Sequence, residues 1–167
     1  MLVDRALSSR QVGPYGLQAA IAAVHAQATE ASATDWSQIV GLYDVLARIE
    51  PSPVVELNRA IAIAMRDGPA AGLEIVDRIR SEPSLAGYHL LPSVRGDLLV
   101  KLGRRGEARA EFERAASLTR NARERALLLD RAAACAADRG EETGKCFVNT
   151  TDALRALDRP ADRVRFE

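Results

Sequence analysis

The hydrophobic positions of this chain recur every three or four residues, and the clearest example spans 51–79. Such spacing places apolar side chains on one side of an α-helix. Ser52 is suited to cap a first helix with Pro53 in its first turn, and Asp67-Gly68 to form a corner before Pro69 opens a second. The apolar positions of the two helices are Val54, Leu57, Ile61 and Ala64, then Leu73, Val76 and Ile79. The segment is therefore predicted to form a helical hairpin whose apolar faces need neighbours.

The same spacing precedes this hairpin and predicts three further helices, at 2–9, at 15–29 after Pro14, and from Asp35 to about Ile49. Asp35 is placed to cap the third of these helices. Asp44 and Arg48 stand four residues apart and are expected to form a surface ion pair. The apolar stripes are Leu17, Ala20, Ile21, Val24 and Ala28 in one helix, and Trp36, Ile39, Val40, Tyr43 and Ala47 in the next.

Beyond the hairpin, a loop at 81–87 leads to a helix at 88–102, regular from near Leu91, and then to a corner at 103–106. Two more helices are predicted at 107–118 and 122–138. Their expected inward residues are Ala108, Phe112 and Ala115, then Ala122, Ala126, Leu129, Ala133 and Ala136. The pattern predicts an all-α fold of about seven helices without strands.

The hydrophobic period is lost near the end of the chain, in the segment GEETGKCFVNTT. We therefore predict one helical domain over 1–140 and a weakly ordered tail over 141–167, with a short helix possible only at 151–157. A chain of 167 residues, 47% of them hydrophobic, is long enough for one domain with a substantial core.

Charge and apolar content exclude several classes of function. The 23 basic and 23 acidic residues cancel, which argues against a chain that binds DNA by itself through phosphate contacts. No apolar run reaches the roughly 18 residues of a membrane span, and the charged start is unlike a signal peptide. The expected location is therefore the cytoplasm, where Cys135 and Cys146 are interpreted as reduced thiols.

Catalytic and metal-binding patterns are not found. His25 and His89 lack companions at metal-ligand spacing, and no serine lies in a G-x-S-x-G turn. The glycines of GRRG at 103–106 follow no strand, so they fit a helix corner better than a phosphate loop. The sequence therefore predicts a protein that is not an enzyme and holds no cofactor or metal.

One stretch carries a specific resemblance. The residues LLVKLGRRGEARAEFERAASL, at 98–118, resemble a tetratricopeptide repeat through the LG-R-x-x-EA turn, the small Ala108 and Ala115, and the aromatic Phe112. The hairpin at 54–79 matches in outline, somewhat under forty residues earlier, near the period of helix-turn-helix solenoids. The resemblance implies a right-handed stack of antiparallel helical hairpins, a tetratricopeptide-like α-solenoid.

A second resemblance covers more of the chain, about 2–131. GPYGLQAAIAAVHAQA, TDWSQIVGLYDVL, the 51–79 hairpin and LGRRGEARAEFERAASLTRNARER occur here in the same order as in a known bacterial group. The chain resembles the C-terminal extension of a subgroup of extracytoplasmic-function (ECF) RNA polymerase sigma factors. That resemblance implies a regulatory, protein-interaction domain whose partners are the factor's N-terminal domains, core RNA polymerase, or both. No promoter-reading helix-turn-helix is found, and the abrupt start at Met1 suits a fragment or an isolated extension.

Partner-binding candidates are the aromatic and polar residues that could face a concave groove: Tyr15, Trp36, Tyr43, Asn58, Arg59 and Tyr88. Core packing is the favoured interpretation for Trp36 and Tyr43. Asn58 and Arg59 are expected either to hydrogen-bond a neighbouring helix end or to bind a partner. The arginines of 104–125 are interleaved with glutamates, which favours a paired, solvated surface over a binding face.

Three alternatives stay open at this point. The chain could be a free-standing tetratricopeptide adaptor that binds a peptide or protein. A small-molecule sensor or an enzyme would need a polar pocket between helices, around Asn58, His25 and Tyr43. A homodimer is also open, because the sequence does not say whether two copies associate.

Overall fold

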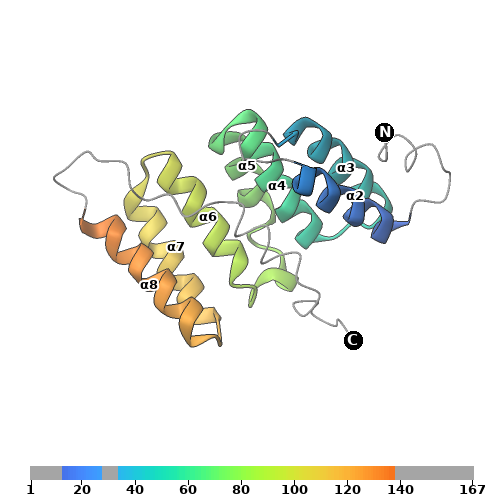
Figure 1. Ribbon diagram of the computed structural model, residues 1–167. Coiled ribbons are helices and arrows are strands. Elements are labelled where there is room, and N and C mark those ends of the chain that lie inside the picture. Colours follow the sequence, from blue (N-terminus) through green and yellow to red (C-terminus); the bar gives the residue numbers. More distant parts are fainter. Residues whose placement is uncertain (1–12, 28–33, 138–167) are drawn as a thin grey trace.

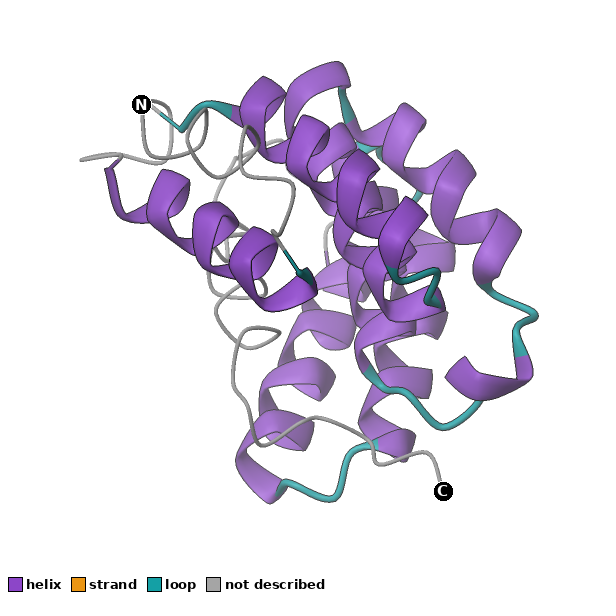
Figure 2. Ribbon diagram, turned by 90° about the vertical axis from the view of Figure 1, so that its right-hand side faces the viewer, coloured by secondary structure: helices purple, strands orange, loops and turns teal. Residues whose placement is uncertain are grey.

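A computed structural model describes residues 13–27 and 34–137 of the chain. The helices predicted at 2–9 and 151–157, and the domain boundary predicted at residue 140, lie outside these ranges. The described residues form seven α-helices and one short 3-10 helix, without a strand (Figures 1 and 2). They are α2 (Pro14–Gln27), α3 (Trp36–Ile49), α4 (Pro53–Asp67), α5 (Pro69–Ile79), η2 (Pro83–Leu85), α6 (Leu90–Lys101), α7 (Arg105–Leu118) and α8 (Ala122–Ala137).

The helices are stacked in chain order. Each one packs mainly against the helix before it and the helix after it, from α2 to α8. In Figure 1, α2–α5 lie together at one end of the stack and α6–α8 at the other. Contacts between neighbours in sequence are characteristic of repeat proteins. The predicted all-α stack of helical hairpins is confirmed.

Local sequence signals set the helix starts as expected. Asp35 accepts a hydrogen bond from the backbone N–H of Gln38 at 3.0 Å, and Ser52 accepts one from Val54 at 3.3 Å. Each bond satisfies an N–H that the first turn of a helix leaves without a partner. Between α4 and α5 the connection is one residue, Gly68, whose φ of 101° favours glycine.

Two connections differ from the prediction. The corner before α7 ends earlier than expected, because α7 begins at Arg105 and Gly106 is already helical. Gly103, with φ of 75°, is the residue that turns the chain there. The predicted loop at 81–87 contains η2, which buries the side chain of Leu85 in the core. A connection with one apolar residue in a polar run gives no periodic signal, so the sequence did not predict this contact.

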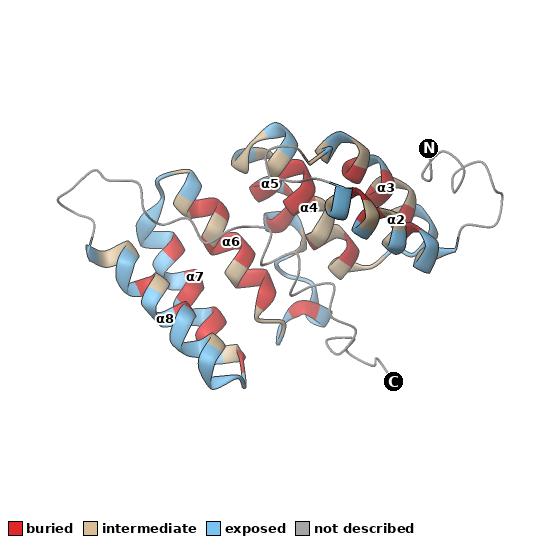
Figure 3. Cartoon of the chain, viewed as in Figure 1, coloured by how far each residue is buried: buried red, intermediate tan, exposed pale blue. Residues whose placement is uncertain are grey.

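The core runs along the inside of the stack (Figure 3). Small residues bring helices of the same hairpin close together. A Cβ atom at Gly72 of α5 would lie 2.7 Å from the backbone oxygen of Ala60 in α4, and one at Gly96 of α6 would touch the ring of Phe112 in α7. The predicted inward residues of α7, Ala108, Phe112 and Ala115, are all buried.

The predicted inner face of α8 is wrong. The helix buries Leu128 and Ala132 fully, and it half-buries Arg131 and Cys135. Of the expected stripe, four members are exposed and one is intermediate: Ala122, Ala126, Leu129 and Ala133, then Ala136. Because alanine and leucine occur on every side of this helix, its sequence allows several apolar stripes. Packing against α7 selects the one that contains Leu128.

Candidate interaction surface

The aromatic candidates of α2 and α3 have different environments. Tyr15 is 69% exposed on α2, whereas Tyr43 is 7% exposed and belongs to the hydrophobic core. Trp36 is partly buried and packs against the core. Its ring lies 5.3 Å from that of His25, edge to face, so the pair joins α3 to α2. Of these candidates, Tyr15 has the most surface to offer a partner.

Arg59 of α4 contacts two carboxylates on the surface. Its Nε donates to Asp44 of α3 at 2.6 Å, and a second guanidinium nitrogen donates to Glu56 at 3.4 Å. The expected pair between Asp44 and Arg48 is replaced by this contact, since the side chain of Asp44 bonds to the neighbouring helix. Arg59 therefore forms an ion pair with the adjacent helix α3. A contact with a neighbouring helix is one of the two roles that its sequence context allows.

Asn58 lies on a different side of α4. Its Oδ1 atom is fully buried and has no hydrogen-bond partner within the described residues. Asn58 and Met65 are seven residues apart, so they share a side of the helix. The sulfur of Met65 lies 4.0 Å from the ammonium nitrogen of Lys101 at the end of α6, whereas Arg59, about 100° further around α4, contacts α3. Asn58 and Arg59 thus do not form one site.

Tyr88 and His89 precede α6 and connect it to α8. The Tyr88 ring is partly buried, and its centroid lies 6.1 Å from that of His89. The Nε2 atom of His89 lies 3.1 Å from a carboxylate oxygen of Glu124, in the first turn of α8. The hydroxyl of Thr119 donates to the other oxygen of Glu124. His89 therefore has a structural partner.

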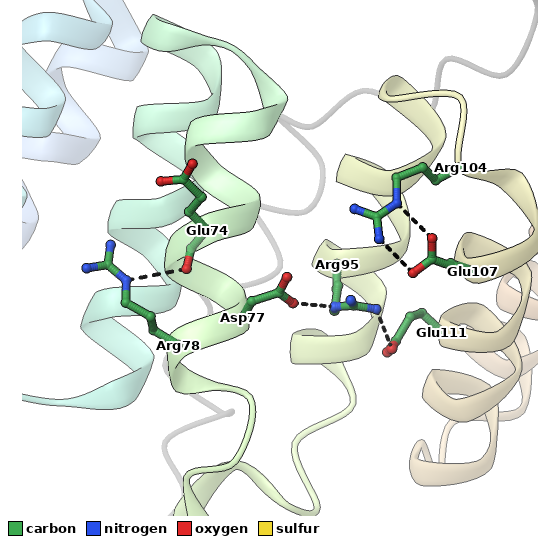
Figure 4. A network of polar contacts seen from close by, with 7 residues as sticks. All are labelled: Glu74, Asp77, Arg78, Arg95, Arg104, Glu107 and Glu111. Carbon is green, nitrogen blue, oxygen red and sulfur yellow. Dashed lines mark hydrogen bonds and ion pairs between the residues drawn. The ribbon is translucent and has the colours of Figure 1, made fainter.

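A charged network at the junction of α5, α6 and α7 was missed by the sequence analysis (Figure 4). Arg95 of α6 donates from Nε to Asp77 of α5 at 2.7 Å and from a terminal nitrogen to Glu111 of α7 at 2.8 Å. The Arg95 and Glu111 side chains are only 9% and 10% exposed, while that of Asp77 is 41% exposed. A buried arginine needs such partners, so the network fixes how these helices meet.

A second charged contact lies at the junction of α6, α7 and α8. The guanidinium of Arg131 in α8 forms an ion pair with Asp97 of α6. Its Cζ atom also lies 4.2 Å from the centroid of the Phe112 ring, a cation–π contact. Arg95 and Arg131 have no distinctive spacing in the sequence, and only the neighbouring helices identify their roles.

In the arginine-rich region of α7 and α8, two arginines pair with the interleaved glutamates. Arg104 donates twice to Glu107, at 2.7 and 2.8 Å, and Arg109 donates to Glu113 at 2.8 Å. The hydrogen bonds from Arg104 hold the pKa of Glu107 below its usual range. Arg125 donates to the backbone oxygens of Ala116 and Thr119 at the end of α7.

Residues 13–27 and 34–137 contain neither a metal-binding cluster nor a membrane-spanning helix. No group of three or more His, Cys, Asp or Glu side chains in 13–27 and 34–137 is arranged to hold a metal ion. In the same ranges, no helix combines the length and apolar character that crossing a membrane requires. Arg59, His89, Arg95 and Arg131 instead make contacts between helices.

Comparisons with known proteins establish the fold. The described architecture is similar to the first TPR (tetratricopeptide repeat) domain of human RPAP3, with a TM-score of 0.59 and 21% identity, covering 75% of this chain and 95% of that one. It is also similar to the Sgt2 TPR domain of Aspergillus fumigatus, with a TM-score of 0.60 and 18% identity over 81% and 88% of the two chains. The chain therefore has a tetratricopeptide-like fold.

In sequence, the chain is 46% identical over 144 residues to an uncharacterised protein of Rhizobium meliloti (strain 1021). The match covers 84% of this chain and 34% of that protein, so the chain spans about a third of the relative's length. No protein-family model matches the chain.

Proposed function

We propose that this chain is the C-terminal regulatory extension of an ECF RNA polymerase sigma factor and acts there as a protein-interaction scaffold. The observation that carries the proposal is the order of the motifs shared with that group, which fall in turn on α2, on α3, on the hairpin of α4 and α5, and on α7 with the start of α8. The relative from Rhizobium meliloti is about three times as long as the matched part, which leaves room for promoter-reading domains.

The stack supports this role because it is held in a fixed geometry. Arg95 bonds to α5 and α7, and Arg131 contacts α6 and α7, so buried charges join one hairpin to the next. Exposed residues on successive helices then keep their relative positions. A preorganised surface loses less conformational entropy when it binds a folded partner. The proposed partners are the factor's own N-terminal domains, core RNA polymerase, or both.

Tyr15 is the proposed contact residue, since an exposed tyrosine supplies apolar area and a hydroxyl on a stiff side chain. The test uses the native gene, read upstream of Met1, to express the complete factor. Tyr15→Ala is expected to weaken binding of the extension to the N-terminal domains or core polymerase by at least about tenfold. Ile49→Ala is the matched control, because Ile49 of α3 is similarly exposed and apolar.

Two results would count against the proposal. One is an upstream reading frame without sigma-like domains. The other is an extension that binds neither partner, together with a factor that keeps its full transcription activity when the extension is deleted. Either result would leave the tetratricopeptide-like fold intact while removing the link to transcription.

The second candidate is a free-standing adaptor that binds a peptide or protein, and the tetratricopeptide-like fold favours it. The upstream reading frame distinguishes the two candidates. A small-molecule sensor has less support, because it requires His25, Tyr43 and Asn58 around one pocket. Tyr43 is buried in the core, and the His25 ring packs against Trp36.

A further inference from the structure

The last described helix, α8, buries much less than its neighbours. Leu128 and Ala132 are its only buried residues, whereas the adjacent α7 buries five. Leu127 and Leu129 are 50% and 47% exposed, and they are two of the four large hydrophobic residues exposed in the described ranges. Two half-exposed leucines on one helix are more apolar surface than the other described helices expose, and they suggest a covered surface.

One side of α8 combines this apolar character with opposite charges. Arg123, Ala126, Leu127 and Asp130 follow the spacing i, i+3, i+4, i+7, so they share one side of the helix. All four are exposed. Within the described residues, the side chains of Arg123 and Asp130 have neither a hydrogen bond nor an ion pair. This four-residue side is called the α8 patch below.

We propose that the α8 patch binds a second copy of this chain, with the two α8 helices antiparallel. A two-fold axis between Ala126 and Leu127 would place Arg123 opposite Asp130 of the partner subunit, and Asp130 opposite Arg123 of the partner subunit. The same axis places Ala126 opposite Leu127 of the partner subunit. In an isologous interface both subunits use the same surface, so each of these contacts occurs twice, once on either side of the axis.

The charges select the antiparallel arrangement. A parallel pair in register would bring Arg123 against Arg123 of the partner subunit and Asp130 against Asp130 of the partner subunit, and both contacts are repulsive. The small side chain of Ala126 allows the helix axes to approach closely enough for Leu127 to be covered. One helix from each copy makes an interface below roughly 1,200 Å², which is the size of weak, reversible association.

The test is sedimentation velocity on the full chain at low ionic strength, over about 5–300 µM, which brackets the micromolar dissociation constant expected of a small interface. Arg123→Asp and Asp130→Arg are each expected to weaken dimerisation by at least about tenfold, since each creates two like-charge contacts. The double variant, R123D with D130R, restores both pairs with reversed sign and should return the dissociation constant to within about threefold of the original.

Leu127, the large apolar residue of the α8 patch, has a matched control on the same helix in Leu129. Leu127→Asp should abolish the dimer, whereas Leu129→Asp should leave it unchanged, because residues two positions apart point about 200° apart around a helix. Both leucines are about half exposed, so neither substitution opens the core, and circular dichroism confirms the fold of each variant.

Four outcomes would overturn the proposal. They are a chain that stays monomeric over the whole range, a dimer insensitive to Arg123→Asp, a double variant that fails to recover, or a dimer lost with Leu129→Asp and kept with Leu127→Asp. The last outcome would assign the contact to the opposite stripe. A patch that binds another segment of the chain or a different protein appears as the first outcome. The proposed role in transcription is independent of all four.

Discussion

The ring of Phe112 lies directly against the backbone of Gly96. A Cβ atom at Gly96 would be only 2.6 Å from the nearest ring carbon, closer than real contacts allow. Gly96 is in α6 and Phe112 in α7, so the pair sets the separation of the helices in this hairpin. The Arg131 guanidinium from α8 lies over the same ring. One aromatic side chain thus joins three consecutive helices.

The first prediction concerns this contact. Gly96→Ala should destabilise the protein by about 1–3 kcal/mol, because the added methyl overpacks a site against the Phe112 ring, which is 1% exposed. The measurement is urea unfolding followed by circular dichroism. In a chain that also carries Phe112→Leu, Gly96→Ala should lower the free energy of unfolding by less than it does alone, so the two substitutions are non-additive. A stabilising Gly96→Ala, as helix propensity alone would give, contradicts the described packing.

The second prediction compares two helical glycines. At Gly72 an added methyl would lie 2.5 Å from the Ala64 side chain and 2.7 Å from the Ala60 backbone oxygen, which cannot turn away. Gly72→Ala should therefore destabilise by at least about 1 kcal/mol. At Gly41 of α3, a Cβ meets nothing within 4 Å, so Gly41→Ala should stabilise by up to about 1 kcal/mol. Thermal unfolding of the two variants should show opposite shifts, and shifts of the same sign would refute the difference in packing.

The third prediction ranks the two carboxylates that bond to Arg95. Glu111→Gln should cost about 1.5–3 kcal/mol, because it removes the charge that offsets a buried guanidinium. Asp77→Asn should cost less than about 1 kcal/mol, since the Asp77 side chain is 41% exposed and water screens its charge. Denaturant unfolding at low and high salt measures both. Added salt should reduce the effect of Asp77→Asn more, and an equal cost for both substitutions would argue against the burial difference.

The fourth prediction is a pH dependence. The pKa of Glu107 is lowered in the folded protein by its hydrogen bonds from Arg104. A carboxyl with a lowered pKa stabilises the fold fully above its unfolded value, near about 4.3, and loses this effect as pH falls through the folded value. The melting temperature of wild type should therefore fall more between about pH 6 and pH 3 than that of Glu107→Gln. Glu82→Gln, which removes an exposed loop carboxylate, is the control and should follow wild type.

Local signals in the sequence predicted most of the fold. The caps Asp35 and Ser52 each place a side-chain oxygen on an N–H of the first turn, and such bonds depend on residues only two or three apart. Three inward residues of α7, Ala108, Phe112 and Ala115, were predicted as well, since they recur at helical spacing in a helix rich in charged residues. Where one face is apolar and the rest is polar, periodicity identifies the buried side.

The sequence was less informative where contacts join distant residues. The stripe predicted for α8 was wrong because this helix is apolar on several sides, and α7 decides which one is buried. Asp44 was paired with Arg48 by spacing, but Arg59 of the next helix offered a closer partner. Arg95 could not be distinguished from a solvated arginine, since Asp77 and Glu111 lie eighteen and sixteen residues away. The candidate surface residues remain a prediction, with Tyr15 the most exposed of them.

The Arg95 network has a consequence for exchanging repeats between proteins. Asp77 comes from the hairpin of α4 and α5, whereas Arg95 and Glu111 come from the hairpin of α6 and α7. A foreign hairpin in place of α4 and α5 could still pack its apolar residues against α6. Without Asp77, however, Arg95 would have only one carboxylate partner, Glu111. The hairpins of this solenoid are therefore not freely interchangeable. A chimera would need an acidic residue at the position of Asp77 in the new hairpin, so that Arg95 keeps both carboxylates.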